Sequence, residues 1–182
     1  MIEIRLHGRG GQGAVTSAEL IAVAAISQGD YAQAFPSFGP ERRGAPVQAF
    51  ARIDKKPIRS REKIYEPDVI LVLDPTLPKI VNITQGLKSS GIAILNSHLP
   101  EPELRKLLNN FPGKIAAVDA TKIAIEELGL PITNTTMLGA FLKATSLISL
   151  SAIEDALNAR FGRLAEKNIN ALKRAIDETK IY

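Results

Sequence analysis

The spacing of hydrophobic residues changes once within the first 30 positions, and the change marks a strand followed by a helix. Apolar and charged side chains alternate over residues 2–6, which indicates a strand. From Ala14 to Ser27 the apolar residues recur at helical spacing. Further along, residues 31–35 are predicted to form a short strand, and residues 47–53 alternate as a strand with two unlike faces. Because a short loop joins these two strands, we expect them to pair antiparallel.

Unbroken apolar runs in the middle of the chain predict buried strands at Val69–Leu73, Ile92–Leu95 and Ile115–Val118. Helices are expected over residues 77–87, 102–110 and 121–128, and a short strand is expected near Ile58. Strands that alternate with helices in this way form parallel sheets. The predicted fold is therefore α/β: a Rossmann-like, mostly parallel sheet with helices on both faces and an antiparallel addition near residues 31–53.

The last third of the chain has no strand pattern and is predicted to be helical, over residues 134–148, 151–161 and 165–180. Ser151 is followed three residues later by Glu154, which predicts a capping box at the start of the second of these helices. The chain shows no internal repeat and no boundary between domains. We therefore expect residues 1–182 to form a single domain.

The composition restricts the chemistry that the chain can perform. With no cysteine among 182 residues, the chain can hold neither a disulfide nor a cysteine-ligated iron–sulfur cluster. Its two histidines are far apart in the sequence, so no metal site is predicted. No recognisable catalytic group of Ser, His and Asp occurs, and no catalytic residue is predicted. Asp74 and Asp119 each follow a buried strand, where a turn or helix cap is favoured over a ligand contact.

The net charge of +4 does not by itself indicate nucleic-acid binding. Basic residues gather only at Lys55–Lys56 and at Arg59, Arg61 and Lys63, with little aromatic interleaving. A solvated basic face, or one that meets an acidic partner, is the favoured interpretation. No apolar run approaches the ~18 residues of a membrane span. The start of the chain shows no signal-peptide pattern, so a cytoplasmic protein is expected.

The candidate chemistry lies in the turn between the first strand and the first helix, where Gly8, Gly10 and Gly13 spell G-x-G-x-x-G. Glycine permits a tight turn and close approach of a ligand, and the free N–H groups of a helix start can hold a phosphate. Close packing without a ligand is an equally weighted alternative. Dinucleotide binding also requires an acidic residue at the end of the second strand, but Asp30 precedes that strand. A free-standing Rossmann-type NAD-dependent oxidoreductase is therefore the alternative function.

A second candidate is the Gly- and Pro-rich loop over residues 37–46. Loops on a rigid scaffold often carry function, and aromatic and Arg residues concentrate at interfaces. On the residues alone, an ordered surface loop anchored by its aromatic side chains is favoured. The interface or ligand candidates in and beside this loop are Phe35, Phe38, Glu41, Arg42, Arg43 and Gly44.

Three segments together resemble the gamma subunit of the 2-oxoacid:ferredoxin oxidoreductases. They are residues 7–13 (HGRGGQG), 33–46 (QAFPSFGPERRGAP) and 134–140 (NTTMLGA). Order and spacing agree across essentially the whole chain, and the segments are specific together although each alone is weak. The sequence of the second segment is most similar to the pyruvate type, pyruvate synthase, and a 2-oxoisovalerate or 2-oxoglutarate type is the alternative.

The resemblance implies that a 2-oxoacid, coenzyme A and oxidised ferredoxin give acyl-coenzyme A, carbon dioxide and reduced ferredoxin. It implies thiamine diphosphate and Mg in the alpha and beta subunits and iron–sulfur clusters in other subunits, including a ferredoxin-like delta subunit. An external ferredoxin would accept the electrons. This chain would bind no cofactor alone, would complete the assembly, and would contact neither nucleic acid nor membrane.

Two roles are open for the glycine turn, whose candidate residues are Gly8, Arg9, Gly10, Gly11, Gln12 and Gly13. Its N–H groups, with Arg9 and Gln12 nearby, can help to bind a phosphate of coenzyme A, to which Arg42 and Arg43 can add charge-assisted contacts. Alternatively, the turn and the loop form a protein interface. The interface is the favoured interpretation.

Overall fold

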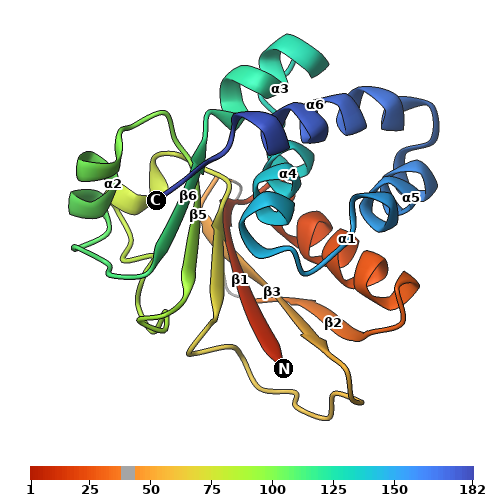
Figure 1. Cartoon of the computed structure of the whole chain (residues 1–182), viewed down its shortest axis with the longest axis horizontal. Coiled ribbons are helices and arrows are strands. Elements are labelled where there is room, and N and C mark those ends of the chain that lie inside the picture. Colours follow the sequence, from red (N-terminus) through yellow and green to blue (C-terminus); the bar gives the residue numbers. More distant parts are fainter. Residues whose placement is uncertain (38–43) are drawn as a thin grey trace.

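One sheet organises the computed structural model, which describes residues 1–37 and 44–182 (Figure 1). Its strands are β1 (Ile2–Arg9), β2 (Tyr31–Pro36), β3 (Pro46–Asp54), β4 (Val69–Val72), β5 (Ile92–Asn96), β6 (Lys114–Val118) and β7 (Lys180–Ile181). The strand order is β2-β3-β1-β4-β5-β6-β7. The central strands β1, β4, β5 and β6 run parallel, β3 is antiparallel to both β1 and β2, and β7 is antiparallel to β6. The mostly parallel sheet and its antiparallel addition are confirmed.

The helices cover the two faces of the sheet unequally. They are α1 (Ala14–Ser27), α2 (Glu101–Leu107), α3 (Ala120–Leu128), α4 (Asn134–Thr145), α5 (Leu150–Phe161) and α6 (Ala165–Glu178), with short 3₁₀ turns at Leu77–Lys79 and Gly162–Leu164. α1 and the helices from α3 to α6 contribute to the large core on one face. The smaller core on the other face takes α2 and the first 3₁₀ turn. Helices on both faces and a helical C-terminal third are therefore confirmed.

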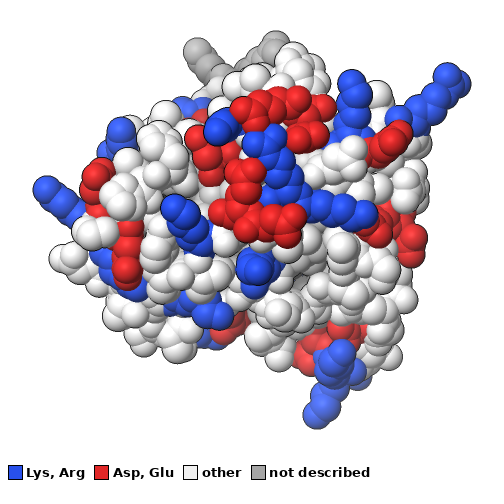
Figure 2. Space-filling view, turned by 45° about the horizontal axis from the view of Figure 1, so that its top comes forward, with Lys and Arg blue, Asp and Glu red and all other residues white. Residues whose placement is uncertain are grey.

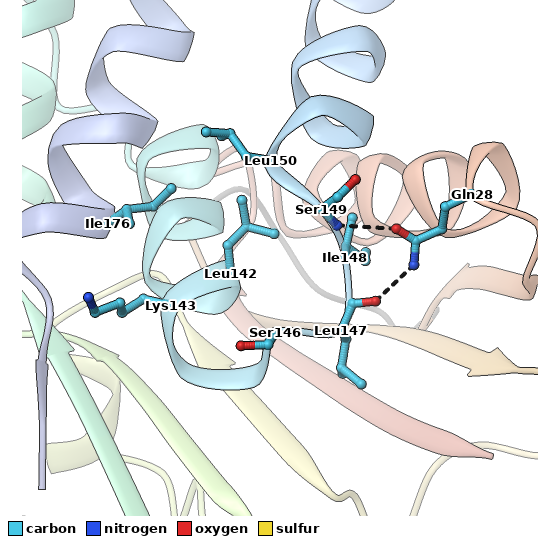
Figure 3. A pocket seen from close by; sticks show the side chains of 9 residues that line it. All are labelled: Gln28, Leu142, Lys143, Ser146, Leu147, Ile148, Ser149, Leu150 and Ile176. Carbon is cyan, nitrogen blue, oxygen red and sulfur yellow. Dashed lines mark hydrogen bonds between the residues drawn. The ribbon is translucent and has the colours of Figure 1, made fainter.

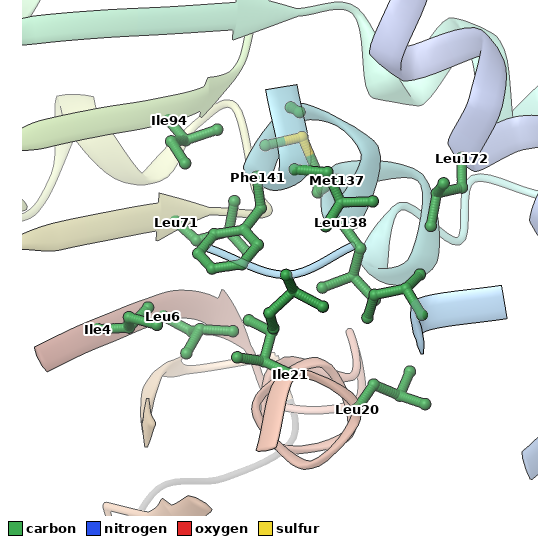
Figure 4. Close-up of a cluster of buried hydrophobic side chains, with 14 of the residues drawn as sticks. Ile4, Leu6, Leu20, Ile21, Leu71, Ile94, Met137, Leu138, Phe141 and Leu172 are labelled. Atoms are coloured by element: carbon green, nitrogen blue, oxygen red, sulfur yellow. The ribbon is translucent and has the colours of Figure 1, made fainter. Parts of the chain in front are cut away.

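α4 lies at the centre of the large core because nearly every side of it is apolar or small. Phe141 and Met137 are fully buried, and Figure 4 shows Phe141 between Leu71 of β4 and Ile21 of α1. Gly139 allows α6 to approach closely, since a Cβ at this position would collide with the backbone oxygen of Leu172. The start of α4 lies beside the start of α1, where the Ser17 hydroxyl donates to the Asn134 carbonyl at 3.3 Å.

The predicted helix over residues 77–87 is wrong: only Leu77–Lys79 forms a 3₁₀ turn. Arg5 is buried beneath this segment and donates to the carbonyl oxygens of Ile83 (3.1 Å) and Gln85 (2.6 Å). A buried guanidinium must find acceptors, and here they are backbone carbonyls of this segment.

The strand predicted near Ile58 is also wrong, because the segment between β3 and β4 is irregular. The Ile58 carbonyl accepts a hydrogen bond from the Gln33 side chain at 3.1 Å instead of pairing with a neighbouring strand.

The C-terminal strand β7 was not predicted, because two residues are too few to show an alternating pattern. The predicted capping box is wrong as well. Ser149, not Ser151, is the N-cap of α5, and its Oγ accepts from the Ala152 N–H at 3.3 Å.

Candidate functional site

The glycine turn joins the end of β1 to the start of α1, and its backbone requires glycine at two positions. Gly11 has φ +95° and Gly13 has φ +79°, conformations that side chains other than hydrogen disfavour. Gly13 also packs against Asn134 at the start of α4, where a Cβ would lie 2.5 Å from the Asn134 Nδ2. The first and third segments of the sequence motif are therefore in direct contact.

Gln12 and Arg9 stabilise this turn through their side chains. The Gln12 Oε1 accepts from the Arg9 N–H at 2.7 Å, and the Gln12 Nε2 donates to the Asp74 Oδ2 at 2.6 Å. Arg9 donates to the same Asp74 oxygen at 3.2 Å, to the Thr76 hydroxyl at 2.8 Å and to the Gly44 carbonyl at 3.1 Å. The side-chain amide of Gln12 and most of the Arg9 guanidinium are therefore engaged in hydrogen bonds within the chain.

Asp74 is the acceptor at the centre of this network. Burial alone would raise the pKa of its carboxyl, but hydrogen bonds from Thr76 and Gln12, together with the charge of Arg9, hold that pKa below its usual value. The predicted structural role of Asp74 in the turn is confirmed, since Thr76 N donates to its Oδ1 at 2.8 Å. The hydrogen bonds of Asp74 to Gln12 and Arg9 were not predicted from the sequence. The one feature that could have indicated them is the position of Asp74 at the end of a buried strand.

The network fills the crevice where a dinucleotide binds in an open α/β sheet. Such ligands lie beyond the carboxyl ends of the strands, at the point where connections leave toward opposite faces. Here that point is between β1, which continues into α1, and β4, which continues into Leu77–Lys79 on the other face. Asp74 and its partners lie at this point, and the other neighbour of β1 is the antiparallel β3. This arrangement does not favour the NAD-dependent alternative.

A hollow of about 520 Å³ opens on the β3 side of the glycine turn. It is lined by Arg9, Gly10, Gly11, Gly13, Ala14, Val15, Thr16, Pro36, Ser37, Val47 and Gln48. No side chain caps the start of α1, and within the described ranges the N–H groups of residues 14–16 have no acceptor. Amides of this kind can accept an anion, because the helix dipole adds to their partial positive charge.

The structure separates the predicted loop residues. Gly44 belongs with the glycine turn, because its N–H donates to the Gly10 carbonyl at 3.3 Å and its own carbonyl accepts from Arg9. Phe35 instead stacks near Phe50, with ring centroids 5.2 Å apart, and the Arg52 guanidinium lies over its ring. The remaining candidates, Phe38, Glu41, Arg42 and Arg43, lie outside the described residues.

His7, the first residue of the glycine motif, is buried on the opposite face of β1 from the large core. The Arg5 Nε donates to the His7 Nε2 at 3.0 Å, so His7 carries its proton on Nδ1. Burial, reinforced by the positive charge of Arg5, lowers the pKa of His7 to about 3. His7 is therefore neutral at physiological pH and acts as an acceptor for Arg5.

Another hollow, of about 600 Å³, lies at the opposite end of α1 (Figure 3). The Gln28 side chain donates to the Leu147 carbonyl at 2.9 Å and accepts from the Ser149 N–H at 3.1 Å. It thereby joins the end of α1 to the connection between α4 and α5.

In the part of the chain that the structure describes, no helix is long and apolar enough to cross a membrane. The same residues contain no group of three or more potential metal ligands.

The fold and the site together define an α/β protein in which side chains occupy the dinucleotide crevice, beside backbone amides that have no acceptor among the described residues. The chain belongs to the pyruvate ferredoxin/flavodoxin oxidoreductase family, whose sequence pattern matches residues 3–178.

Relatives align with the chain over its full length. The pyruvate/ketoisovalerate oxidoreductases common subunit gamma of Thermococcus kodakarensis is 56% identical, over 100% of this chain and 99% of that protein. The pyruvate synthase subunit PorC of Methanothermobacter thermautotrophicus is 48% identical, over 98% and 96%. The crystal structure of the pyruvate oxidoreductase subunit PORC from Thermotoga maritima superposes with a TM-score of 0.87 at 41% identity, covering 99% of this chain and 97% of that chain.

The fold also occurs within a longer polypeptide. A 2-oxoglutarate:ferredoxin oxidoreductase from Magnetococcus marinus, solved with 2-oxoglutarate, coenzyme A and succinyl-CoA bound, matches with a TM-score of 0.74 at 19% identity. The match covers 97% of this chain but 30% of that one. At this identity the likeness concerns the fold alone.

Proposed function

We propose that this chain is the gamma subunit of a pyruvate-type 2-oxoacid:ferredoxin oxidoreductase. The observation that carries the proposal is the full-length correspondence to proteins named as such gamma subunits, at 56% and 48% identity. In the assembled enzyme, alpha and beta subunits hold thiamine diphosphate with Mg, a delta subunit holds iron–sulfur clusters, and an external ferredoxin accepts electrons. The cytoplasmic location and the single-domain organisation expected from the sequence are part of this proposal.

An apolar hollow supports a role in assembly. It measures about 270 Å³ and is lined by Leu128, Leu130, Ile132, Asn134, Phe161, Leu164, Lys167 and Asn168. The side chains of Leu130, Ile132 and Leu164 are 56%, 48% and 65% exposed, respectively. Exposed apolar groups that cluster around a hollow are typical of protein interfaces. Asn134 links this surface to the glycine turn, because it also contacts Gly13.

Co-expression with the partner subunits tests the proposal. We expect the chain to co-purify with larger subunits and to show no oxidation of pyruvate on its own. The assembled complex should reduce ferredoxin in the presence of pyruvate and coenzyme A. Activity of the isolated chain, or tight NAD binding by it, would contradict the proposal.

Within that enzyme, we propose that the amides of residues 14–16, which have no acceptor among the described residues, bind a phosphate of coenzyme A. Gln12 and most of Arg9 serve to hold the turn in shape, since their polar atoms are bonded to Asp74, Thr76 and the backbone. In this proposal the phosphate is bound by backbone amides, and not by the side chains of Gln12 and Arg9. The hollow of about 520 Å³ beside the amides provides the space for the ligand. The alternative, in which a partner subunit fills this hollow, makes a different prediction.

Val15 lines the hollow, is 36% exposed, and has an N–H with no acceptor in the described part of the chain, so it offers a matched pair of variants. Val15→Glu places a negative charge beside the amides, while Val15→Gln has nearly the same shape without the charge. Glu is favourable at a helix N-terminus, so the fold should be unaffected. In the assembled enzyme we expect Val15→Glu to raise the KM for coenzyme A about tenfold, equivalent to ~1.4 kcal/mol, and Val15→Gln to leave it near the wild-type value.

The two roles of the turn separate in this experiment. Loss of co-purification in both variants would favour the interface over the phosphate. An unchanged KM for coenzyme A in an intact complex carrying Val15→Glu would disprove the phosphate contact.

A further inference from the structure

The surplus of positive charge in this protein is confined to one short segment, residues 55–63, which we call the basic segment. It contains five cationic residues and one carboxylate, so its surplus of four equals the net charge of +4 of the whole chain. The rest of the sequence carries equal numbers of the two signs. The cationic residues of the basic segment are Lys55, Lys56, Arg59, Arg61 and Lys63, and all are exposed.

Among the described residues, cations without an ion pair are scattered along the rest of the chain, whereas the basic segment gathers four of them within nine residues. Figure 2 shows both signs interleaved over the face that carries α3 and α6. There Arg174 pairs with Glu126 at 2.5 Å, Glu178 at 2.6 Å and Glu127 at 3.1 Å. In the basic segment only Lys55 forms an ion pair among the described residues, with Asp30, and the Lys55 side chain remains 84% exposed.

The basic segment is irregular, but buried donors hold its backbone in place. The Arg52 side chain is 2% exposed and donates to the Glu62 carbonyl at 2.7 Å. The Gln33 amide donates to the Ile58 carbonyl at 3.1 Å, and Ile64 just beyond the segment is buried. The positive charges are therefore presented from a fixed backbone beside β2, the edge strand next to β3 (Figure 1).

A hollow of about 370 Å³ lies between this segment and β2. It is lined by Gln33, Ala34, Phe35, Ser60 and Arg61. A side chain from a partner can enter it and meet the Arg61 guanidinium and the Ser60 hydroxyl at its wall. Both groups suit a carboxylate, which accepts hydrogen bonds from each.

We propose that the basic segment is a docking surface for an acidic protein that associates transiently, and, given the proposed function, that this partner is the electron acceptor. A charged surface rich in Lys is typical of contacts that steer an encounter, because the cores of permanent interfaces are depleted in charged residues. The exposed apolar surface around Leu130 and Leu164 has the opposite character and suits permanent contact. Few aromatic side chains accompany the cations, which disfavours nucleic acid.

The experiment compares charge-reversed complexes in ferredoxin reduction with pyruvate and coenzyme A. The test variant is Arg59→Glu with Arg61→Glu. The matched control, Lys106→Glu with Lys122→Glu, makes the same change in net charge at exposed positions on α2 and α3. We expect the test variant to raise the KM for ferredoxin about tenfold at low salt with kcat unchanged, and the difference to shrink above ~0.5 M salt. The control should behave as the wild type.

Three results would overturn the docking proposal. An unchanged KM for ferredoxin would mean that the basic segment is only a solvated face. Loss of co-purification of the partner subunits in the test variant alone would assign the segment to a permanent interface. An equal rise in KM in both variants would mean that net charge, and not this surface, governs the encounter. An inactive wild-type complex would instead contradict the proposed function, so the two failures are distinguishable.

Discussion

His7 shows how a buried neutral side chain makes the stability of this protein depend on pH. Its pKa in the folded state is about 3, well below the ordinary value of 6.5. As pH falls below about 6.5 the unfolded chain takes up a proton on this residue, but the folded protein does not until about pH 3. The stabilisation that comes from His7 being neutral is therefore present above pH 6.5 and is lost as pH falls through that window. The lowered pKa of Asp74 acts in the same direction at the acid end.

We expect the free energy of unfolding, measured by urea denaturation, to decrease as pH falls through this window. Between pH 6 and pH 4, His7 should contribute a loss of up to about 1.4 kcal/mol per pH unit. His7→Gln should flatten that dependence, because a glutamine oxygen can still accept from the Arg5 Nε and has no proton to gain. His98→Gln is the matched control, since His98 is exposed. The same pH slope in His7→Gln as in the wild type would show that other groups cause it.

At the scale of elements, the spacing of apolar residues predicted the helices and strands that are determined by residues close together in the sequence. Helix α1 begins and ends where its apolar spacing indicated, and the buried runs became β4, β5 and β6. The helix expected over residues 77–87 failed because its carbonyls bind Arg5, which lies about 80 residues earlier. No window of sequence contains both partners of such a bond.

In the candidate site, too, the local turn could be predicted from the sequence, but the contacts between distant residues could not. The positive φ angles of Gly11 and Gly13 agree with a turn that the sequence pattern required. The bonds from Gln12 and Arg9 to Asp74 join residues more than 60 positions apart, so their place in the site depended on the strand order. The contact between Gly13 and Asn134 is of the same kind, and only the family resemblance had placed both residues in motifs.

The corrected start of α5 gives a direct test of which hydroxyl caps it. Ser149 Oγ accepts from the Ala152 N–H, whereas Ser151 is exposed and lies within the helix. We expect Ser149→Ala to lower the free energy of unfolding by about 1 kcal/mol, because the Ala152 N–H loses its acceptor. Ser151→Ala is the matched control and should change it by less than about 0.5 kcal/mol. The reverse order of the two effects would restore the capping box predicted from the sequence.

At the scale of the whole molecule, the described surface divides into regions of different character. The face with α3 and α6 carries the Arg174 ion pairs, the basic segment carries four cations without an ion pair, and the hollow between Leu130 and Leu164 is apolar. Asn134 lies in the wall of that hollow and against Gly13 at once. A partner subunit seated on the apolar surface would therefore lie next to the glycine turn. This proximity makes the interface and the phosphate roles of the turn compatible.

Leu130→Ser combined with Leu164→Ser tests that arrangement. Both side chains are more than half exposed, so the free energy of unfolding of the isolated chain should change by less than about 1 kcal/mol. Co-purification with the partner subunits should fall sharply, since an interface loses apolar contacts that the isolated chain does not use. Ile80→Ser is the control, because Ile80 is 60% exposed and lies outside this hollow. Full assembly in the double variant would mean that the partner subunits bind elsewhere, and the glycine turn would then have to hold its ligand without them.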